Sequence, residues 1–186
     1  MVVEDIRNTG GDALAVKVDC NDDGEVGLLG IHPWMHRGID ALVLNHGRYQ
    51  RVAAEEMTID DLRTTMKTNF EGAVGVWKAV QPHLTDSARI VVVGSQLGTR
   101  GSPHGADYSA SKAALAMWAR SLALALGPQG KRVNILAPGY VDTAILAGDS
   151  KQKRKEREQQ VPLKRVASPE DMAGTISFLI GPDSSY

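Results

Sequence analysis

Residues 89–95 read RIVVVGS, and residues 108–126 read YSASKAALAMWARSLALAL. The first five residues of the former segment are mostly β-branched or apolar, and such a short run predicts a strand that ends at the glycine and serine. The second segment is long enough for a helix, and its side chains are apolar or small nearly all round, so we expect burial on several sides. A strand followed by a buried helix is typical of an α/β fold.

The same alternation extends in both directions along the chain. Short apolar runs predict three more strands, at residues 13–18, 39–44 and 132–137. A last helix is predicted after Ser168, which stands at the N-cap position before a first-turn proline and two acidic residues. This order predicts one α/β domain over residues 1–186, with a mostly parallel sheet and helices on both faces. Ligands are expected outside the carboxyl ends of the strands. The residues at those ends are Asp19, Asn45, Ser95 and Pro138.

A long helix is predicted at residues 58–80, where Thr58 and Asp61 resemble a capping box. Its core-facing side chains recur at spacings of three and four. They are Ile59, Leu62, Met66, Asn69, Ala73, Val76 and Val80. Asn69 is the one polar member of this apolar face, and a buried amide needs hydrogen-bond partners.

Two segments near the start are less regular. The chain opens with a sequence that predicts an amphipathic helix, which should stop at Gly10 and Gly11. Residues 21–38 contain Gly24, Gly27, Gly30 and Pro33, which weaken or break helices, so we expect a poor helix or a loop there.

Composition limits the possible partners. The 186 residues contain 21 Lys and Arg against 22 Asp and Glu, a net charge of −1. This balance gives no overall field for attracting nucleic acid or an anionic membrane, so neither is expected as a partner. Cys20 is the only cysteine, which excludes an internal disulfide. No signal peptide and no run of roughly 20 apolar residues is present, so a cytoplasmic location is expected.

Tyr108 and Lys112 stand four residues apart at the start of a predicted helix, so both side chains lie on one face. A free phenol has a pKa near 10, and a neighbouring ammonium lowers that pKa by favouring the phenolate. Tyr108 could then act as a general acid or base at neutral pH. A lone pair at this spacing is more often a partly buried aromatic beside a solvated lysine, but Ser95 and Asn69 favour the functional interpretation.

Several motifs follow one another in a characteristic order. They are Asp19, Asn45-His46-Gly47, Asn69, Ser95, Tyr108-Ser109-Ala110-Ser111-Lys112, Arg132-Val133-Asn134 running to Pro138-Gly139, and Thr143. In the order and spacing of these motifs the sequence resembles the short-chain dehydrogenase/reductase family over nearly its whole length. The resemblance implies a Rossmann-like, doubly wound parallel sheet. It also implies reversible hydride transfer between NAD or NADP and a small carbonyl or secondary alcohol substrate.

The resemblance further implies a role for each matching residue. Tyr108 would pass the proton, Lys112 would lower the pKa of Tyr108 and bind the nicotinamide ribose, and Ser95 would bond the substrate oxygen. Asn69 would support a water in the proton relay. The residues implied in cofactor binding are Asp19, Cys20, Asn45, His46 and Gly47 on the adenosine side, Tyr108 and Lys112, and Pro138, Gly139 and Thr143 at the nicotinamide end. No metal ion is implied. A homodimer or homotetramer would form through the helices that carry Asn69 and Tyr108.

The chain departs from the family pattern in several places. The family's glycine-rich phosphate loop between its first strand and helix is missing, and Thr9-Gly10-Gly11 follows a helix, so we interpret it as a helix cap. The second family strand, which selects NAD or NADP, and the seventh strand are also missing. His46 replaces a common alanine, and its ring would either crowd the adenosine or face solvent.

The sheet is therefore predicted to be incomplete. Without the two central strands, the segment 13–18 and the strand 39–44 would lie roughly 14 Å apart, because neighbouring strands are about 4.8 Å apart. Three alternatives remain open: the segment shifts to pair with residues 39–44, another chain fills the gap, or the sequence is part of a longer protein.

Other functions are weaker alternatives. Gly94-Ser95-Gln96-Leu97-Gly98 resembles a hydrolase nucleophile elbow, but its serine is displaced by one position. His32 and His36 lack a third metal ligand and are expected at the surface. The basic run 151–157 predicts a solvated helix face, in a segment that could also favour an acidic ligand. Beside the oxidoreductase, a non-catalytic family member or fragment that acts as an oligomerisation or scaffold subunit remains possible.

Overall fold

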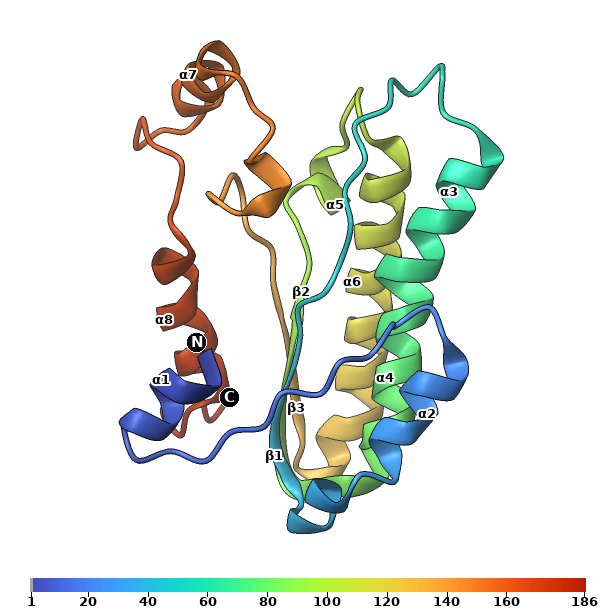
Figure 1. Cartoon of the computed structure of the whole chain (residues 1–186), viewed down its shortest axis with the longest axis vertical. Coiled ribbons are helices and arrows are strands. Elements are labelled where there is room, and N and C mark those ends of the chain that lie inside the picture. The colour runs from blue at the N-terminus through green and yellow to red at the C-terminus, as the bar shows by residue number, and fades with distance from the viewer. Residues whose placement is uncertain (1) are drawn as a thin grey trace.

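A three-stranded parallel sheet forms the centre of the molecule, whose computed structural model describes residues 2–186 (Figure 1). The strands are β1 (Ile39–Leu44), β2 (Leu84–Val93) and β3 (Arg132–Leu136), in the order β1-β2-β3. Leu42 of β1 pairs with Ile90 of β2, which pairs with Val133 of β3. The central strand β2 is fully buried along Ile90, Val91 and Val92, as expected for a parallel sheet covered on both faces.

Helices cover both faces of the sheet, which confirms the predicted Rossmann-like α/β arrangement. One face is covered by α3 (Ile59–Met66), α4 (Gly72–Val80) and α6 (Ala106–Leu126), with α2 (Asp23–Gly30) packed on α4. On the opposite face α8 (Pro169–Ile180) packs against β2 and β3, and α1 (Val2–Asn8) lies on the same side (Figure 1). The remaining helical segments are Pro33–Arg37, the π-helical turn Lys67–Glu71, Gln81–His83, α5 (Leu97–Arg100), Gly127–Gln129, Ala144–Leu146 and α7 (Lys151–Gln160).

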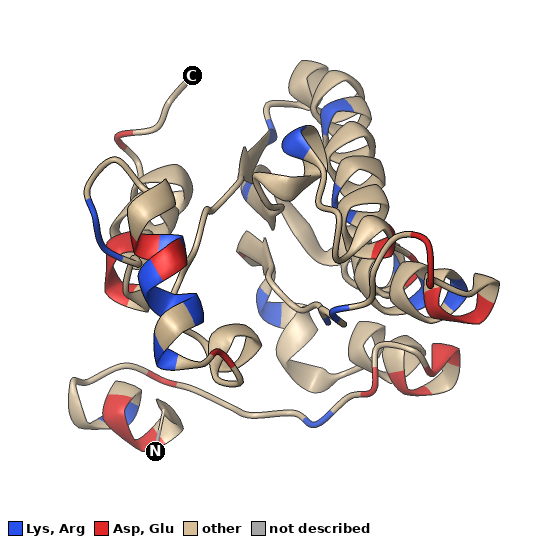
Figure 2. Cartoon of the chain, turned by 90° about the horizontal axis from the view of Figure 1, so that it is seen from above, with Lys and Arg blue, Asp and Glu red and all other residues tan. Residues whose placement is uncertain are grey.

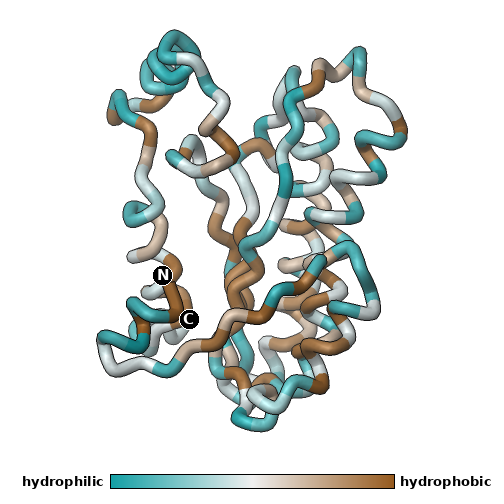
Figure 3. The backbone as a smooth tube through the Cα atoms, viewed as in Figure 1, coloured by the Kyte–Doolittle hydropathy of each residue, from teal (hydrophilic) through white to brown (hydrophobic). Residues whose placement is uncertain are grey.

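The hydrophobic core lies between the sheet and the layer of α4 and α6. Ile90 and Val92 of β2 pack there against Leu115 and Ala119 of α6 and Trp77 of α4. Figure 3 shows hydrophobic residues gathered on the strands, whereas α7 is hydrophilic along its whole length. Burying one large aliphatic side chain stabilises a fold by about 1.5–3 kcal/mol, so this layer holds α6 firmly on the sheet.

Local signals in the sequence are confirmed at several helix ends. Thr58 and Asp61 form the predicted capping box, and Ser168 forms a second one with Asp171. Gly10 adopts a φ of +87° after α1, where its N–H donates to the carbonyl of Arg7. The helix over residues 58–80 is continuous, but its middle turn is π-helical and carries Asn69.

The predicted strand at residues 13–18 is wrong. This segment is irregular, and the side chains of Leu14 and Val16 are 44% and 49% exposed. A strand needs a neighbour for its backbone N–H and C=O groups, and β1 pairs only with β2. The alternative in which residues 13–18 shift to pair with β1 is therefore not adopted. The prediction of β1 as a buried strand is also partly wrong, because Ala41 and Val43, which point to the face opposite Leu42 and Leu44, are exposed.

Residues 21–38 are more ordered than a poor helix or loop. Asp22 caps α2 by accepting hydrogen bonds from the backbone N–H groups of Gly24 and Glu25. At the other end of α2, a Cβ atom on Gly30 would lie 2.6 Å from the carbonyl oxygen of Ala79. Glycine here therefore allows α2 to approach α4 closely, and the sequence pattern does not reveal this tertiary reason for the residue.

One helix face is less buried than predicted, and another helix is open on one side. Ile59 at the start of α3 is exposed, so the buried stripe of that helix begins at Leu62. On α6, Met117 and Leu124 are exposed, so the helix is buried on several sides, as expected, but keeps one open face. Within residues 2–186, no helix is long and apolar enough to cross a membrane.

Candidate active site

A cavity of about 320 Å³ opens at the carboxyl ends of the three strands. Its walls contain residues from the loop after each strand and from the first turns of α6, as predicted for this sheet type. The predicted site residues that line it are Asn45, Gly47, Ser95, Tyr108, Lys112, Pro138, Gly139 and Thr143. Backbone hydrogen bonds from Gly94 to Leu136 and from Gln96 to Pro138, at 2.7 and 2.9 Å, hold the second and third loops together.

Tyr108 is positioned by the turn that precedes α6. Gly105 has a φ of +135°, and a Cβ atom at this residue would lie 2.5 Å from the ring of Tyr49. The Tyr49 hydroxyl donates a 2.5 Å hydrogen bond to the carbonyl of His104, and its ring lies edge-on to Tyr108 with 4.9 Å between ring centroids. Tyr108 is thus held as a buried aromatic at the cavity wall.

Lys112 lies one helical turn further along α6, and its side chain is buried. Its Nζ donates a 2.9 Å hydrogen bond to the carbonyl of Val93 and lies 5.9 Å from the ring centroid of Tyr108. Burial lowers the pKa of this ammonium to about 8, because the charged form loses its hydration.

The pKa of Tyr108 differs from the expectation. Burial raises the pKa of the phenol, and the hydrogen bond with Ser95 only partly opposes this rise. The ammonium of Lys112 was expected to lower this pKa, but its hydrogen bond goes to a backbone carbonyl instead of the phenol oxygen. Tyr108 is therefore neutral at neutral pH.

Asn69 supports the site from behind the cavity wall, which it does not line. Its Nδ2 donates to the carbonyl of Arg48 and to Oγ of Ser111, both at 3.0 Å, and its Oδ1 accepts from the Arg48 N–H at 2.7 Å. The buried amide therefore finds the partners that the sequence required, and they join the loop after β1 to α6. A Cβ atom on Gly47 would lie 3.3 Å from Asn69 Oδ1 and 3.4 Å from Lys112 Nζ, so only glycine leaves this corner open.

Three of the predicted cofactor residues lie outside the cavity. Asp19 is exposed, and its carboxylate accepts hydrogen bonds from Asn21 at 2.9 and 3.0 Å. Cys20 is a half-buried free thiol beside Gly72 of α4.

The ring of His46 does not face solvent. It packs against Gly72, where a Cβ atom would lie 3.3 Å from its Nε2. Nε2 is buried and has no hydrogen-bond partner among residues 2–186. Burial and the nearby charge of Lys112 lower the pKa of this imidazole, so it is neutral at neutral pH.

The cavity wall also contains side chains that were not predicted, among them those of Tyr49, Tyr140 and Arg157. Tyr140 directly follows Pro138-Gly139, so its place at a strand end could have been found in the sequence. Arg157 belongs to the basic run whose side chains were expected to face water. Seen from the end of the molecule that carries α7, basic and acidic residues are mixed on this helix (Figure 2). The charge pattern therefore gave no sign that Arg157 alone is buried.

The strand ends, helices and cavity can be compared with those of known proteins. A family model described as enoyl-(acyl carrier protein) reductase matches residues 2–186. An oxidoreductase of Methylorubrum extorquens is 33% identical over 191 aligned residues, which span 100% of this chain and 76% of the relative. Cis-4-hydroxycyclohexanecarboxylate dehydrogenase of Sinomonas cyclohexanicum is 32% identical, again over 100% of this chain and 76% of the relative.

A solved structure supports the same assignment. The short-chain dehydrogenase of Burkholderia cenocepacia, in complex with NADP, has a TM-score of 0.90 and 32% identity. The comparison covers 99% of this chain and 76% of that protein. One conclusion follows from the parallel sheet, from these relatives and from the side chains of Ser95, Tyr108 and Lys112 in the cavity wall. The chain belongs to the short-chain dehydrogenase/reductase family of oxidoreductases.

Proposed function

We propose that the protein catalyses reversible hydride transfer between NAD or NADP and a small carbonyl or secondary alcohol. The observation that carries this proposal is the convergence of Ser95, Tyr108 and Lys112 on one cavity at the carboxyl ends of the strands. The relatives support the reaction class, since one is an oxidoreductase, two are dehydrogenases and the Burkholderia cenocepacia structure holds NADP. When bound, the nicotinamide ring would supply or accept the hydride.

Tyr108 is the proposed proton donor for carbonyl reduction. A neutral phenol can protonate the oxygen on which negative charge develops, and the raised pKa of Tyr108 supports the neutral form before reaction. Ser95 would donate a hydrogen bond to the same oxygen. Donors that are already oriented stabilise the transition state more than the ground state, because charge grows on the oxygen as hydride arrives.

Lys112 and Asn69 are proposed to support this chemistry in different ways. The Lys112 ammonium, held by one backbone carbonyl, has further N–H donors for the nicotinamide ribose. Movement of the ammonium towards Tyr108 on binding would lower the pKa of the phenol and favour the reverse reaction. Asn69 would act as a positioning residue through its bonds to Arg48 and Ser111, in addition to the water contact implied by the family.

The cavity has features that fit the nicotinamide half of the cofactor. Gly47 keeps a corner open beside Lys112, and Gly139 lies against Gln96 at the opposite wall. Thr9-Gly10-Gly11 ends α1 as a helix cap, as predicted, and is not proposed as a phosphate loop. Asp19, Cys20, Asn45, His46, Pro138 and Thr143 complete the proposed cofactor contacts.

A subunit contact through α6 is proposed as well. Its open face carries small or apolar side chains at helical spacing. They are Ala110, Ala113, Met117 and Leu124. This face also favours the second candidate function, a non-catalytic subunit that assembles through α6. Sedimentation of wild type against Met117→Lys would test the contact, and a monomeric wild type would contradict it.

Titration of the purified chain with NADH and, separately, NADPH tests the main proposal through nicotinamide fluorescence. We expect saturable binding, followed by turnover in a screen of aldehydes, ketones and secondary alcohols. Tyr108→Phe should bind cofactor like the wild type but lose about 10²–10⁴-fold in kcat, since it removes a proton donor. A folded protein that binds neither cofactor would instead support the non-catalytic subunit.

A further inference from the structure

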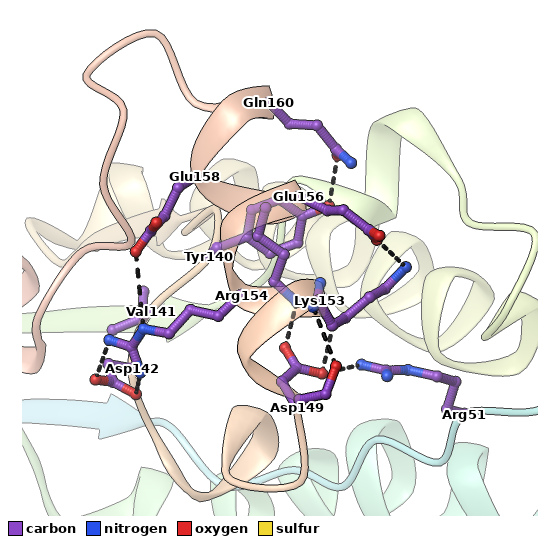
Figure 4. Close-up of polar contacts among 12 residues, drawn as sticks. Arg51, Tyr140, Val141, Asp142, Asp149, Lys153, Arg154, Glu156, Glu158 and Gln160 are labelled. Atoms are coloured by element: carbon purple, nitrogen blue, oxygen red, sulfur yellow. Dashed lines mark hydrogen bonds and ion pairs between the residues drawn. The ribbon is translucent and has the colours of Figure 1, made fainter.

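A carboxylate and two arginines meet beside the cavity, and the proposed proton transfer does not use them. Asp149 accepts hydrogen bonds from Nε and Nη2 of Arg157, the second at 3.3 Å. It accepts another from Nη2 of Arg51 at 2.9 Å (Figure 4). Asp149 and Arg157 belong to residues 142–166, between the bridge partners Val141 and Ala167, which we call the lid. Arg51 comes from the loop after β1, so Asp149 joins two distant segments.

Arg157 is the only member of this group that lines the cavity. Its guanidinium lies over the ring of Tyr140, with 4.6 Å to the ring centroid. The neighbouring wall of the lid and α8 is largely apolar, with Ile145, Leu146 and Met172. Only 10% of the Arg157 side chain is exposed, so a guanidinium without a counter-charge would be costly in this wall.

Asp149 supplies that counter-charge. Its side chain is 6% exposed, and the hydrogen bonds of Arg157, with a further contribution from Arg51, hold the pKa of this carboxyl below its usual range. Asp149 is therefore ionised at neutral pH and neutralises Arg157. Arg51 approaches from outside the cavity and is 40% exposed, so water screens its charge.

We propose that Asp149 determines which substrate charge the cavity accepts. By binding two guanidinium nitrogens of Arg157, it leaves the lid side of the wall, opposite in role to the Lys112 ammonium, without net charge, and this side prefers an uncharged substrate group to a carboxylate. Without Asp149, the guanidinium would be free to bind a carboxylate, which its planar donor geometry suits. This inference rests on the proposed function and adds the charge class of its substrate.

The lid offers a matched control. Arg154 donates to Asp142 at 2.6 Å in a second Asp–Arg pair (Figure 4). Its two side chains are about half exposed, at 49% and 47%, and neither lines the cavity. Asp142→Asn therefore removes a carboxylate from the lid, as Asp149→Asn does, but leaves the charge of the cavity wall unchanged.

Ligand-observed NMR with hexanamide and hexanoate tests the inference without turnover, because the two probes have equal chain length and differ in charge. We expect the wild type to bind hexanamide at least about fivefold more tightly than hexanoate. Asp149→Asn should bind hexanoate more tightly than hexanamide by at least the same factor. Asp142→Asn should behave like the wild type. The double variant Asp149→Asn/Arg157→Gln should lose the preference for hexanoate, which a purely structural role of Asp149 does not predict.

Several results would overturn the inference. For the wild type, these results are a preference for hexanoate, or no binding of either probe to the folded protein. For Asp149→Asn, they are an equal loss of affinity for both probes, or the same affinities for the two probes as the wild type shows. Failure of the proposed function would look different. The wild type would then leave NADH and NADPH unoxidised with every carbonyl compound tested, while the opposite probe preferences of the wild type and Asp149→Asn persisted.

Discussion

At the scale of single residues, burial changes the chemistry that spacing alone suggests. The four-residue spacing of Tyr108 and Lys112 was predicted to bring a phenol and an ammonium together, and both line one cavity. Their pKa values nevertheless follow desolvation first, which raises that of Tyr108 and lowers that of Lys112. The ionic states at this site therefore depend on how deeply α6 packs, and not only on its sequence.

Lys112 should make stability depend on pH above neutrality. Its pKa falls from 10.5 to about 8 on folding, so the folded state releases this proton first and gains stability as pH rises through that range. Between pH 7 and 9.5 the gain amounts to about 2 kcal/mol of unfolding free energy. Urea unfolding of wild type and Lys112→Met at both pH values checks this. The free energy of unfolding of Lys112→Met should exceed that of the wild type by less at pH 9.5 than at pH 7. The same difference at both pH values would contradict the prediction.

Asn69 should contribute to stability as well as to the site. Asn69→Ala removes its three hydrogen bonds and leaves the half-buried N–H and carbonyl of Arg48 without these partners. We expect a loss of about 2–4 kcal/mol in the free energy of unfolding, measured by urea denaturation. Thr64→Ala on the exposed face of α3 is the control and should change stability by less than about 1 kcal/mol. Equal losses in both variants would show that the amide network carries little energy.

At the scale of elements, helix ends follow local rules, whereas helix packing does not. The capping boxes of α3 and α8 form within four residues of chain, so their sequence signals were sufficient. The glycines of α2 suggested a broken helix, but the Asp22 cap and packing on α4 outweigh their low helix propensity.

Two glycines of α2 should respond in opposite ways to alanine. A Cβ atom at Gly27 meets nothing within 4 Å, so Gly27→Ala should raise the free energy of unfolding by about 0.5–1 kcal/mol through helix propensity. Gly30→Ala places its methyl group 2.6 Å from the Ala79 carbonyl oxygen and should lower stability despite the same propensity gain. Thermal unfolding of the two variants checks this. Stabilisation by both would mean that α2 does not pack closely on α4.

At the scale of the whole molecule, the sheet keeps a free edge at β1. The apolar segment 13–18 has no strand beside it and remains partly exposed, although its composition is that of a buried strand. Pairing of a strand requires backbone partners at the right distance, and composition cannot supply them.

Core truncations should distinguish this segment from the sheet. Ile90→Ala in the fully buried strand β2 should cost about 2–5 kcal/mol, because it leaves a cavity among Leu115 and its neighbours. Val16→Ala, at a side chain that is 49% exposed, should change stability by less than about 0.5 kcal/mol. Urea unfolding gives both values. A large loss for Val16→Ala would mean that residues 13–18 are buried in solution, as in a paired strand.

The sequence by itself determined the order of β1, β2 and β3 and of the long helices between them, the capping residues, and the positions of Ser95, Tyr108 and Lys112 at strand and helix ends. These features depend on neighbours within one or two turns of chain, which any sequence displays directly. Only the tertiary structure decided the irregular path of residues 13–18, the raised pKa of Tyr108 and the contact of Asp149 with Arg51, 98 residues away. Strand pairing, desolvation and ion pairing across the chain depend on which distant segments meet, and no local pattern contains that information.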